Sequence, residues 1–278
     1  MTATPFDPSN DPGPDFASLL RRAGLEPPVP NGDVSANLDV VHGTTCVSLR
    51  YRDGVVIAGD RRATSGNIIS HRSIQKVFAA DRHSGVAIAG AAGPAVEMVK
   101  LFQLQLEHYE KVEGSSLSLE GKANQLSMML RNNLPMAMQG LAVVPIFAGY
   151  DLAAEEGRLF QYDVTGGRYE ELDYTATGSG SLHAGTVIKI SFIDDMDRDQ
   201  AVNLAIEALF QAADSDSATG LPDLIRGVYP VVATITAEGF DRVEDSELED
   251  KTRQLIEAFT SRGGRDGGNS LSTDGGVA

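Results

Sequence analysis

The chain has 278 residues, of which 42% are apolar, and it carries a net charge of −16 with one cysteine and five histidines. This length and apolar content are enough for one large domain, or two small ones, with a real core. The acidic charge argues against nucleic acid or an anionic membrane as a partner, because both require clustered Lys and Arg. A single cysteine excludes an internal disulfide framework and fits a reducing cytoplasm, and the scattered histidines give little support to a zinc site.

Both ends of the chain differ from its middle. Residues 1–43 hold seven of the twelve prolines and one short amphipathic run at 15–25, and the last sixteen residues are rich in glycine. We expect residues 1–43 to be a mobile appendage unless they dock on a partner, 44–262 to be the folded domain, and 263–278 to be a disordered tail. The start lacks a basic region followed by an apolar run, and no stretch reaches transmembrane length, so we expect a soluble cytoplasmic protein.

The predicted elements favour the α+β class, because strands and helices come in separate groups along the chain. Residues 46–51 and 55–60 are predicted to form a hairpin in which Asp53 and Gly54 supply the positive φ values of a tight turn. Pro135 is expected to end or kink the second helix. The further predicted elements are a strand pair within 67–81 and 85–90, a helix from Pro94 to about 112, a helix over 120–138, strands at 141–151 and 158–164, a helix from about Asp197, a strand at 231–239 and a helix over 245–261.

The hairpin predicts that Thr44 and Asp60 share a site. A two-residue loop at Asp53 and Gly54, or one residue earlier, pairs Thr44 with a residue between 61 and 63. Asp60 is then offset by a few residues along the partner strand, on the order of 10 Å, and side chains close much of that gap.

Lys76 is a second candidate. If residues 74–78 form a strand, Ile74, Lys76 and Phe78 project from one face, and the ammonium group lies between two apolar neighbours. Such a charge needs a partner, and Asp60 is the candidate; a lysine partly desolvated beside a carboxylate can act electrostatically at a nucleophilic centre. The alternative is an edge-strand charge that deters aggregation.

Thr44 by itself is an ordinary strand residue, and only its context makes it a candidate nucleophile. A threonine hydroxyl needs a base, and a free α-amine on the same residue, with a pKa of about 8, supplies one. That amine exists only if the chain is cut after Gly43. Glycine suits such a cut because it adopts backbone angles that other residues cannot and leaves its carbonyl uncrowded.

Several separated motifs resemble one family, the catalytic β subunits of the proteasome core particle, most closely those of actinobacteria. The resemblance covers about residues 40–262 and implies a four-layer αββα sandwich of two antiparallel sheets, the N-terminal-nucleophile hydrolase fold. Its motifs are GTT at 43–45, GVVIAGDRRAT at 54–64, QKVF at 75–78, IAGAAG at 88–93, GSGS at 178–181 and DSATG at 216–220. The stretches that resemble the actinobacterial branch in particular are LEHYEK at 106–111 and SATGLPDLIRG at 217–227.

The resemblance implies a role for each matching residue. Thr44 would be the nucleophile, exposed when its hydroxyl attacks the Gly43 carbonyl and residues 1–43 leave as a propeptide. The residues implied around Thr44 are Asp60 and Lys76, which complete the catalytic group, and Ser179, Asp216 and Thr219, which hydrogen-bond around the amine. Thr219 stands where the family usually has a serine, and the hydroxyl is kept.

The resemblance also implies how substrate is bound. The Gly90 N–H would form the oxyanion hole, and main-chain groups of Thr64, Gly90 and Ala92 would bind substrate as an added strand. Cleavage after hydrophobic side chains is expected, because the implied specificity pocket is apolar. Its residues are Ala63, Ile74, Ile88, Ala92 and Val96.

By the same resemblance, the chain would be a threonine endopeptidase of unfolded proteins that needs no metal or organic cofactor. It would form a homo-heptameric β ring closed off by α-subunit rings, and would be served indirectly by a ring ATPase and protein-tagged substrates. Two alternatives remain. One is the simpler bacterial peptidase that works with an unfoldase ring, which normally has almost no leader; the other is a structural β subunit, which would lack the threonine or the lysine.

Two other features point to competing chemistry. GSGSLHAG at 178–185 is similar to a phosphate-binding loop, but His183 stands where the third glycine belongs and no ribose-binding acid follows. Cys46 lacks a base, and a buried core thiol explains it better than a nucleophile. We also expect the leader to keep the Thr44 amine blocked until assembly, and its LLRRAGL segment at 19–25 to dock at a subunit interface.

Overall fold

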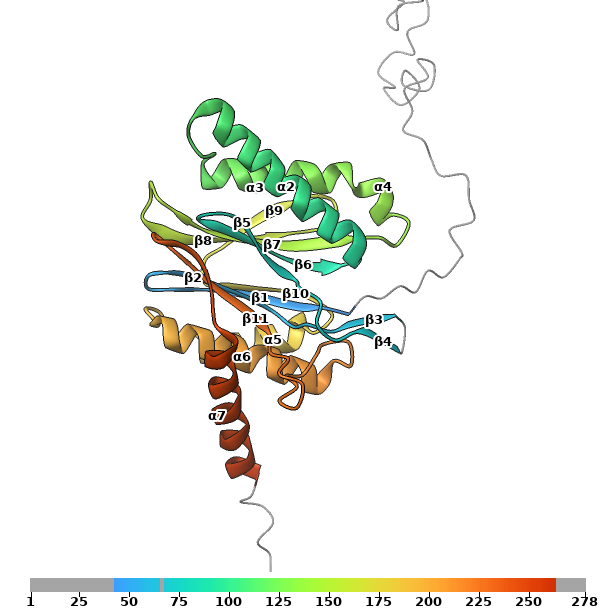
Figure 1. Cartoon of the computed structure of the whole chain (residues 1–278), viewed down its shortest axis with the longest axis vertical. Helices are drawn as coiled ribbons and strands as arrows, with labels where there is room; N and C mark the ends of the chain where they lie inside the picture. The colour runs from blue at the N-terminus through green and yellow to red at the C-terminus, as the bar shows by residue number, and fades with distance from the viewer. Residues whose placement is uncertain (1–42, 66–67, 264–278) are drawn as a thin grey trace, which may run out of the picture. The chain divides into compact units, whose positions relative to one another are not determined.

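Two five-stranded antiparallel sheets stack on each other, and helices cover both outer faces (Figure 1). The computed structural model describes residues 43–65 and 68–263. The predicted appendage, apart from Gly43, and the predicted tail from residue 264 lie outside the described residues. This αββα order of layers is the predicted α+β class.

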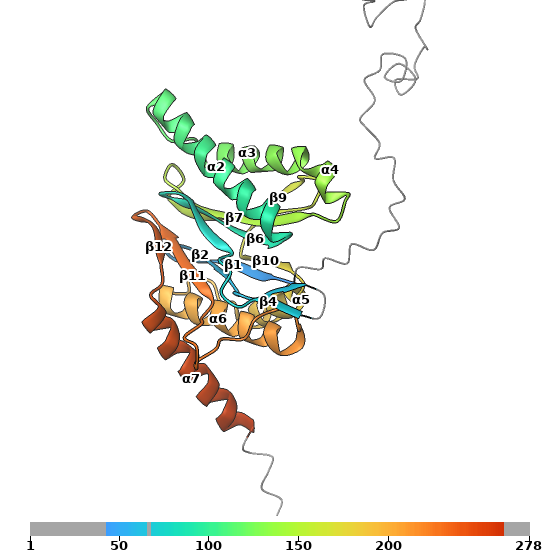
Figure 2. The ribbon, with the colours of Figure 1, turned by 45° about the vertical axis from the view of Figure 1, so that its right-hand side comes forward.

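The first sheet has the strand order β10-β1-β2-β11-β12, and a two-stranded β3-β4 ribbon lies beside it at the far end of the β1-β2 hairpin (Figures 1 and 2). Every pairing in this sheet is antiparallel. The strands are β1 (Thr45–Tyr51), β2 (Gly54–Gly59), β10 (Tyr174–Gly178), β11 (Val231–Thr236) and β12 (Gly239–Arg242), with β3 (Ala63–Ser65) and β4 (Ile68–His71) in the ribbon.

The second sheet runs in chain order, β5-β6-β7-β8-β9, as a meander with antiparallel pairings throughout. Its strands are β5 (Val77–Asp81), β6 (Ser84–Gly90), β7 (Val143–Asp151), β8 (Glu156–Tyr162) and β9 (Arg168–Glu171). The β6-β7 pairing brings Gly90 opposite Val143, so the end of β6 lies at the point where the chain enters the outer helices.

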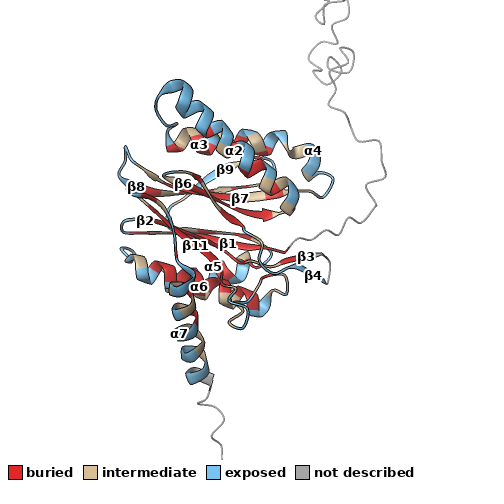
Figure 3. Cartoon of the chain, in the orientation of Figure 1, coloured by how far each residue is buried: buried red, intermediate tan, exposed pale blue. Residues whose placement is uncertain are grey.

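Helices form the two outer layers, and Figure 3 shows their buried sides turned toward the sheets. Those over the second sheet are α2 (Ala92–Glu113), α3 (Leu119–Asn132) and α4 (Leu134–Ala137); those over the first sheet are α5 (Ser181–Ser191) and α6 (Arg198–Ser215), and α7 (Asp245–Gly263) follows β12. Asp197 caps α6 in a capping box with Gln200, which explains why that helix begins where the sequence predicts it. None of the described helices is long and apolar enough to span a membrane.

Strand β2 illustrates how the layers are held together. Its side chains alternate between two cores: Val56 and Ala58 pack toward α5 and α6, while Val55 and Ile57 pack between the two sheets. Both faces of the strand are therefore buried, and its sequence is continuously apolar rather than alternating. A third core lies between the second sheet and helices α2 and α3.

Several predicted elements differ from the structure, and strands β3, β9 and β10 lie outside every predicted strand. The helix predicted over 120–138 ends at Asn132, just before Pro135 as expected, and Pro135 itself lies in the short α4 that follows. Helix α2 begins at Ala92, two residues before Pro94. Helix α5 was not predicted as a helix. Residues 74–76 are not in a strand, because β5 begins only at Val77.

The turn of the β1-β2 hairpin is the earlier of the two predicted loops, but it lacks the predicted positive φ values. Tyr51 pairs with Gly54, so the two loop residues are Arg52 and Asp53, and neither has a positive φ. Gly54 belongs to β2, where an added Cβ would lie 2.0 Å from the Ile235 carbonyl oxygen. Glycine is therefore required here by the close approach of β11 and not by the turn.

Candidate active site

The hairpin register places Asp60 beside the start of β1. Cys46 pairs with Gly59, so Asp60 follows the end of β2 opposite Thr45. The Asp60 N–H donates to the Thr45 carbonyl oxygen (3.1 Å), and the Thr45 N–H donates to Asp60 Oδ1 (2.9 Å). Asp60 therefore lies next to Thr44 in the chain's folded form, as the hairpin arithmetic predicts.

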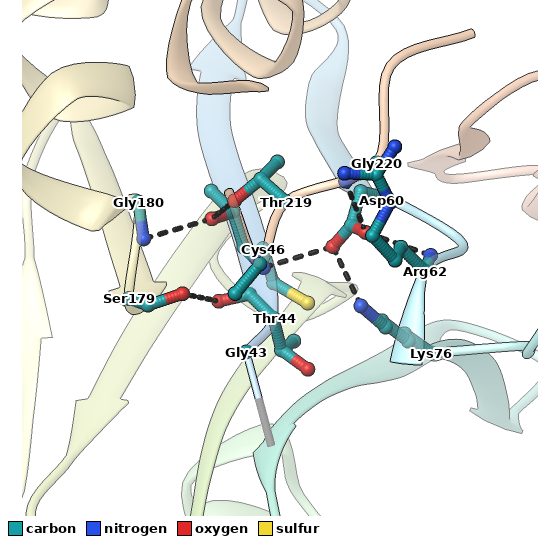
Figure 4. Close-up of polar contacts among 12 residues, drawn as sticks. Gly43, Thr44, Cys46, Asp60, Arg62, Lys76, Ser179, Gly180, Thr219 and Gly220 are labelled. Atoms are coloured by element: carbon teal, nitrogen blue, oxygen red, sulfur yellow. Dashed lines mark hydrogen bonds and ion pairs between the residues drawn. The ribbon is translucent and has the colours of Figure 1, made fainter. Parts of the chain in front are cut away.

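The Asp60 carboxylate is a fully buried hydrogen-bond centre (Figure 4). Its Oδ1 accepts from the Thr45 N–H and from the Lys76 ammonium (2.6 Å). Its Oδ2 accepts from the N–H groups of Arg62 (2.8 Å) and Gly220 (2.9 Å). Four donors satisfy one buried charge, so the carboxylate joins β1, the segment after β2, the loop before β5 and the segment after α6.

Lys76 is held by the loop before β5 rather than by a strand, which corrects the prediction of a strand over 74–78. Its carbonyl oxygen accepts from the Ile88 N–H (2.9 Å), which fixes the loop against β6. The side chain is only 4% exposed and pairs with Asp60. A solvated edge-strand charge is excluded by this burial, and the predicted pairing with Asp60 is present.

A second hydrogen-bonded group lies on the opposite side of Thr44. The Thr44 carbonyl oxygen accepts from the Ser179 N–H (2.9 Å), and the Ser179 hydroxyl donates to Asp216 Oδ2 (2.5 Å). Asp216 Oδ2 also accepts from the Thr219 hydroxyl (2.6 Å). Burial favours the protonated acid, but the hydrogen bonds from Ser179, Thr219 and the Ala218 N–H outweigh it, and the pKa of Asp216 is lowered.

Thr45 joins the two groups, and the sequence reasoning did not single it out. Its hydroxyl shares a hydrogen bond with the Thr219 hydroxyl (2.6 Å) and accepts from the Gly180 N–H (3.0 Å). Its own N–H donates to Asp60, as described above. The only sequence signal for this residue was its place in the GTT motif, directly after the candidate nucleophile.

The GSG stretch packs against the same two threonines. Gly178 has a φ of +96°, and a Cβ there would lie 1.8 Å from the Thr44 carbonyl oxygen. Gly180 donates to Thr45 and is the N-cap of α5. This stretch is thus a close-packing turn into a helix, and its contacts are to the start of β1.

An apolar cavity opens beside Thr44. It brings together segments that are distant in sequence: β3, the loop before β5, the end of β6 and the first turns of α2. The residues that line it are Thr44, Ala63, Ile74, Gln75, Lys76, Ile88, Gly90, Ala92, Ala95 and Val96. All five residues predicted for the specificity pocket are among them, together with the predicted oxyanion residue Gly90; Gln75 and Ala95 were not predicted.

The bond between Gly43 and Thr44 is held on both sides. The Gly43 N–H donates to the Thr64 hydroxyl (3.3 Å), and the Thr44 carbonyl accepts from Ser179. A Cβ at Gly43 would lie 1.6 Å from the Ala218 Cβ, a distance that packing does not tolerate. Only glycine fits at position 43 in this conformation.

Cys46 is a core thiol. It is fully buried between the sheets, and its Sγ lies 3.6 Å from the Ile88 carbonyl oxygen. Burial raises the pKa of the thiol to about 12, with the Lys76 ammonium acting in the opposite direction. The thiolate is therefore scarce at neutral pH, and Cys46 is unsuited to act as a nucleophile.

This two-sheet sandwich, with a threonine at the start of its first central strand, has the fold of the N-terminal-nucleophile hydrolases. Residues 40–222 match the family model described as Proteasome subunit. The chain is 57% identical over 260 residues to the "Proteasome subunit beta" of Acidimicrobium ferrooxidans, with 94% of this chain and 95% of that one covered. The protein of the same name from Streptomyces griseus is 60% identical over 220 residues (79% and 78% covered).

A third relative, the "Proteasome subunit beta" of Acidothermus cellulolyticus, is 56% identical over 244 residues, with 86% of this chain and 81% of the relative covered. The chain belongs to the proteasome subunit family, as a β subunit of the actinobacterial type.

Proposed function

We propose that the chain is a catalytic β subunit, a threonine endopeptidase that cuts itself between Gly43 and Thr44 and then hydrolyses unfolded proteins. One observation carries the proposal: Thr44 lines an apolar cavity together with Lys76, and the Lys76 ammonium is paired with the buried carboxylate of Asp60. A structural β subunit has no need of a buried ion pair beside an apolar cavity, because such pairs are costly to bury.

Self-cleavage would follow from the way the bond is held. The Thr44 hydroxyl oxygen attacks the Gly43 carbonyl carbon, the C–N bond breaks, and the nitrogen takes up a proton to become the Thr44 amine. Water then hydrolyses the resulting ester and releases residues 1–43. The contacts of Gly43 with Thr64 and of Thr44 with Ser179 support this step, because they restrain both sides of the bond.

In the cut chain, the new amine would serve as the base for the hydroxyl of the same residue. Asp60 and Lys76 would hold a positive charge near the nucleophile and lower its proton affinity. Ser179, Asp216 and Thr219 would hydrogen-bond around the amine. The Gly90 N–H would stabilise the oxyanion that forms when the hydroxyl attacks a substrate carbonyl.

The cavity would set the cleavage preference. Six of its lining residues have apolar side chains and come from four separate segments, so a hydrophobic side chain before the cut bond gains buried contact there. The backbone of Thr64, Gly90 and Ala92 would bind the peptide as an added strand. We expect faster hydrolysis after leucine or tyrosine than after arginine or aspartate.

The assembled form and the partners are also proposals. The chain would build a homo-heptameric ring that is closed by proteasome α subunits in the cytoplasm, and a ring ATPase would feed it tagged, unfolded proteins. The simpler bacterial peptidase is disfavoured, because the β subunit of Acidimicrobium ferrooxidans matches 94% of this chain. No metal or organic cofactor is required by the proposed steps.

The activity is tested with particles assembled from this chain and α subunits. Wild-type particles are expected to release a fluorophore from a peptide ending in leucine or tyrosine, and Thr44→Ala particles are expected to be inactive. Thr260→Ala, on the exposed face of α7, is the matched control and should keep full activity. Full activity in Thr44→Ala particles would contradict the proposal.

A further inference from the structure

A second cavity is lined by three arginines, two of which, Arg61 and Arg62, directly follow Asp60 in the chain. We call it the arginine cavity, and its walls are Arg61, Arg62, Arg72, residues 220–223 and residues 228–230. Its volume is about 50 Å³. A single water requires roughly 10–15 Å³ by the same measure, so the space is large enough for a small ion.

The three guanidinium groups have few partners. Arg61 Nη2 donates to the Ser73 carbonyl (3.2 Å), and Arg62 Nη1 donates to the Ser217 carbonyl (3.0 Å). The Nε of Arg61 is buried and has no hydrogen-bond partner among the residues that the structure describes. Within residues 43–65 and 68–263, none of the three forms an ion pair with a carboxylate, although the chain carries 39 acidic residues.

One carboxylate also lines the cavity, but it is engaged elsewhere. Asp223 accepts from the N–H groups of Ile225 and Arg226 and pairs with the Arg226 guanidinium (2.6 Å). The charge of Asp223 is therefore balanced by Arg226. The remaining charge around the cavity is that of Arg61, Arg62 and Arg72, a local excess of positive charge in an acidic protein.

We propose that the arginine cavity binds a small doubly charged oxyanion of the phosphate class. Guanidinium groups donate two parallel N–H groups to the oxygens of such anions, and three of them can share a tetrahedral ion. A bound dianion would compensate the charges of the three guanidinium groups, which form no ion pair with a described carboxylate. A carboxylate carries only one charge and two oxygens, so it should bind more weakly.

The walls of the cavity are attached to the segments that hold Asp60 and Lys76. The N–H groups of Arg62 and Gly220 donate to Asp60, and both residues flank that carboxylate in Figure 4. The Arg61 carbonyl accepts from the Ile74 N–H (3.0 Å), in the same loop as Arg72 and Lys76. An anion that bridges Arg61 and Arg72 would hold this loop against the segment after β2 and raise the thermal stability of the chain.

The test is titration of the full-length chain with inorganic phosphate, followed by calorimetry and thermal unfolding at constant ionic strength. A Thr44→Ala background keeps the sample one covalent species, whether or not the proposed self-cleavage occurs. Arg72→Ala removes an exposed arginine whose side chain forms no hydrogen bond or ion pair with the described residues. Arg61→Lys keeps the positive charge but loses the two parallel N–H donors of the guanidinium group. Arg82→Ala, an exposed arginine outside the cavity, is the matched control for the change in charge.

We expect one phosphate per chain, and an affinity that falls at least about tenfold in Arg72→Ala and in Arg61→Lys, as for loss of one charge-assisted hydrogen bond. Arg82→Ala should bind phosphate like the parent chain. Three results would overturn the proposal: no saturable binding of phosphate, an equal loss of affinity in Arg72→Ala and Arg82→Ala, or acetate binding as tightly as phosphate.

Discussion

The Asp60–Lys76 pair predicts an asymmetry between two single substitutions. Asp60→Asn leaves the Lys76 ammonium buried without its carboxylate partner. In wild type, Oδ1 of Asp60 accepts from Thr45 and Lys76, and Oδ2 accepts from Arg62 and Gly220. The NH2 group of the new asparagine takes the place of one of these oxygens, so it faces two N–H donors that it cannot accept from. Lys76→Met has a similar volume and leaves the carboxylate with three backbone N–H donors. The two changes therefore remove the same ion pair at different cost.

The magnitudes follow from these contacts. Breaking a buried pair so that one charge remains uncompensated costs about 3–5 kcal/mol, and this is the expectation for Asp60→Asn. Losing one charged hydrogen bond while the others remain costs about 1.5–3 kcal/mol, which we expect for Lys76→Met. The double variant replaces both charges by neutral groups, so its cost should be smaller than the sum of the two by at least about 1 kcal/mol.

The assay is urea unfolding of the full-length chain in a Thr44→Ala background, which compares all four proteins in one covalent state. The free energies of unfolding give a double-mutant cycle. The reasoning would be refuted if Lys76→Met cost as much as Asp60→Asn, or if the two costs were additive within error. Peptide hydrolysis by particles with an intact Thr44 should be lost in both single variants, whatever their stability.

Three further predictions concern individual residues. Gly90→Ala should destabilise the fold by about 1–3 kcal/mol, because Gly90 has a φ of +103° and a new Cβ would lie 2.1 Å from the Ala142 carbonyl oxygen. Gly93→Ala should not lower the thermal midpoint, because no atom of the described residues, apart from its chain neighbours and the backbone of its own helix, lies within 4 Å of the added Cβ. Cys46 should resist alkylation at pH 8 in the folded chain and react only on unfolding, because burial raises its pKa to about 12; rapid labelling of the folded chain would be inconsistent with that burial. The pKa of Asp216 is lowered from 3.8, so the stability it contributes is present above its unfolded pKa and is lost as the pH falls through its lower folded pKa. The difference in unfolding free energy between wild type and Asp216→Asn should therefore be constant from pH 6 to 8, on the order of 1 kcal/mol, and should shrink in acid. If this difference did not change down to the pH at which Asp216 is fully protonated, the claim that Asp216 is ionised in the folded chain would be contradicted.

The proximity of Thr44 and Asp60 could be predicted because an antiparallel hairpin fixes which residues lie opposite each other. The turn lies at Arg52 and Asp53, the earlier of the two predicted positions, so the register is within the predicted range. The prediction for Lys76 relied on a strand over residues 74–78, but β5 begins only at Val77 and Lys76 lies in the loop before it. Its burial and its pairing with Asp60 nevertheless agree with the prediction.

Other parts of the site required information beyond local sequence patterns. The walls of the apolar cavity come from β3, the loop before β5, β6 and α2, and no local periodicity relates these segments; their assignment depended on the family resemblance. Helix α5 was not predicted, because it begins directly after Gly178 and Gly180, and closely spaced glycines are typical of a loop. The structure shows that Gly178 is required by the close approach of the Thr44 carbonyl.

Thr45 shows why a hydrogen-bond network is hard to predict. Its hydroxyl forms hydrogen bonds with Thr219 and Gly180, which lie 174 and 135 residues away along the chain. No local sequence pattern distinguishes Thr45 from other strand threonines. Its role in the hydrogen-bond network arises only where three distant segments of the chain meet. Thr219, where the family usually has a serine, places its hydroxyl between Asp216 and Thr45.

The central claim is that the hydroxyl and the amine of Thr44 act together, and that the amine is made by release of residues 1–43. Intact-mass measurement of the β chain from active assembled particles tests this directly. The account predicts one mature species that begins at Thr44. Active particles in which every chain retains the full Met1-to-Ala278 mass would contradict it.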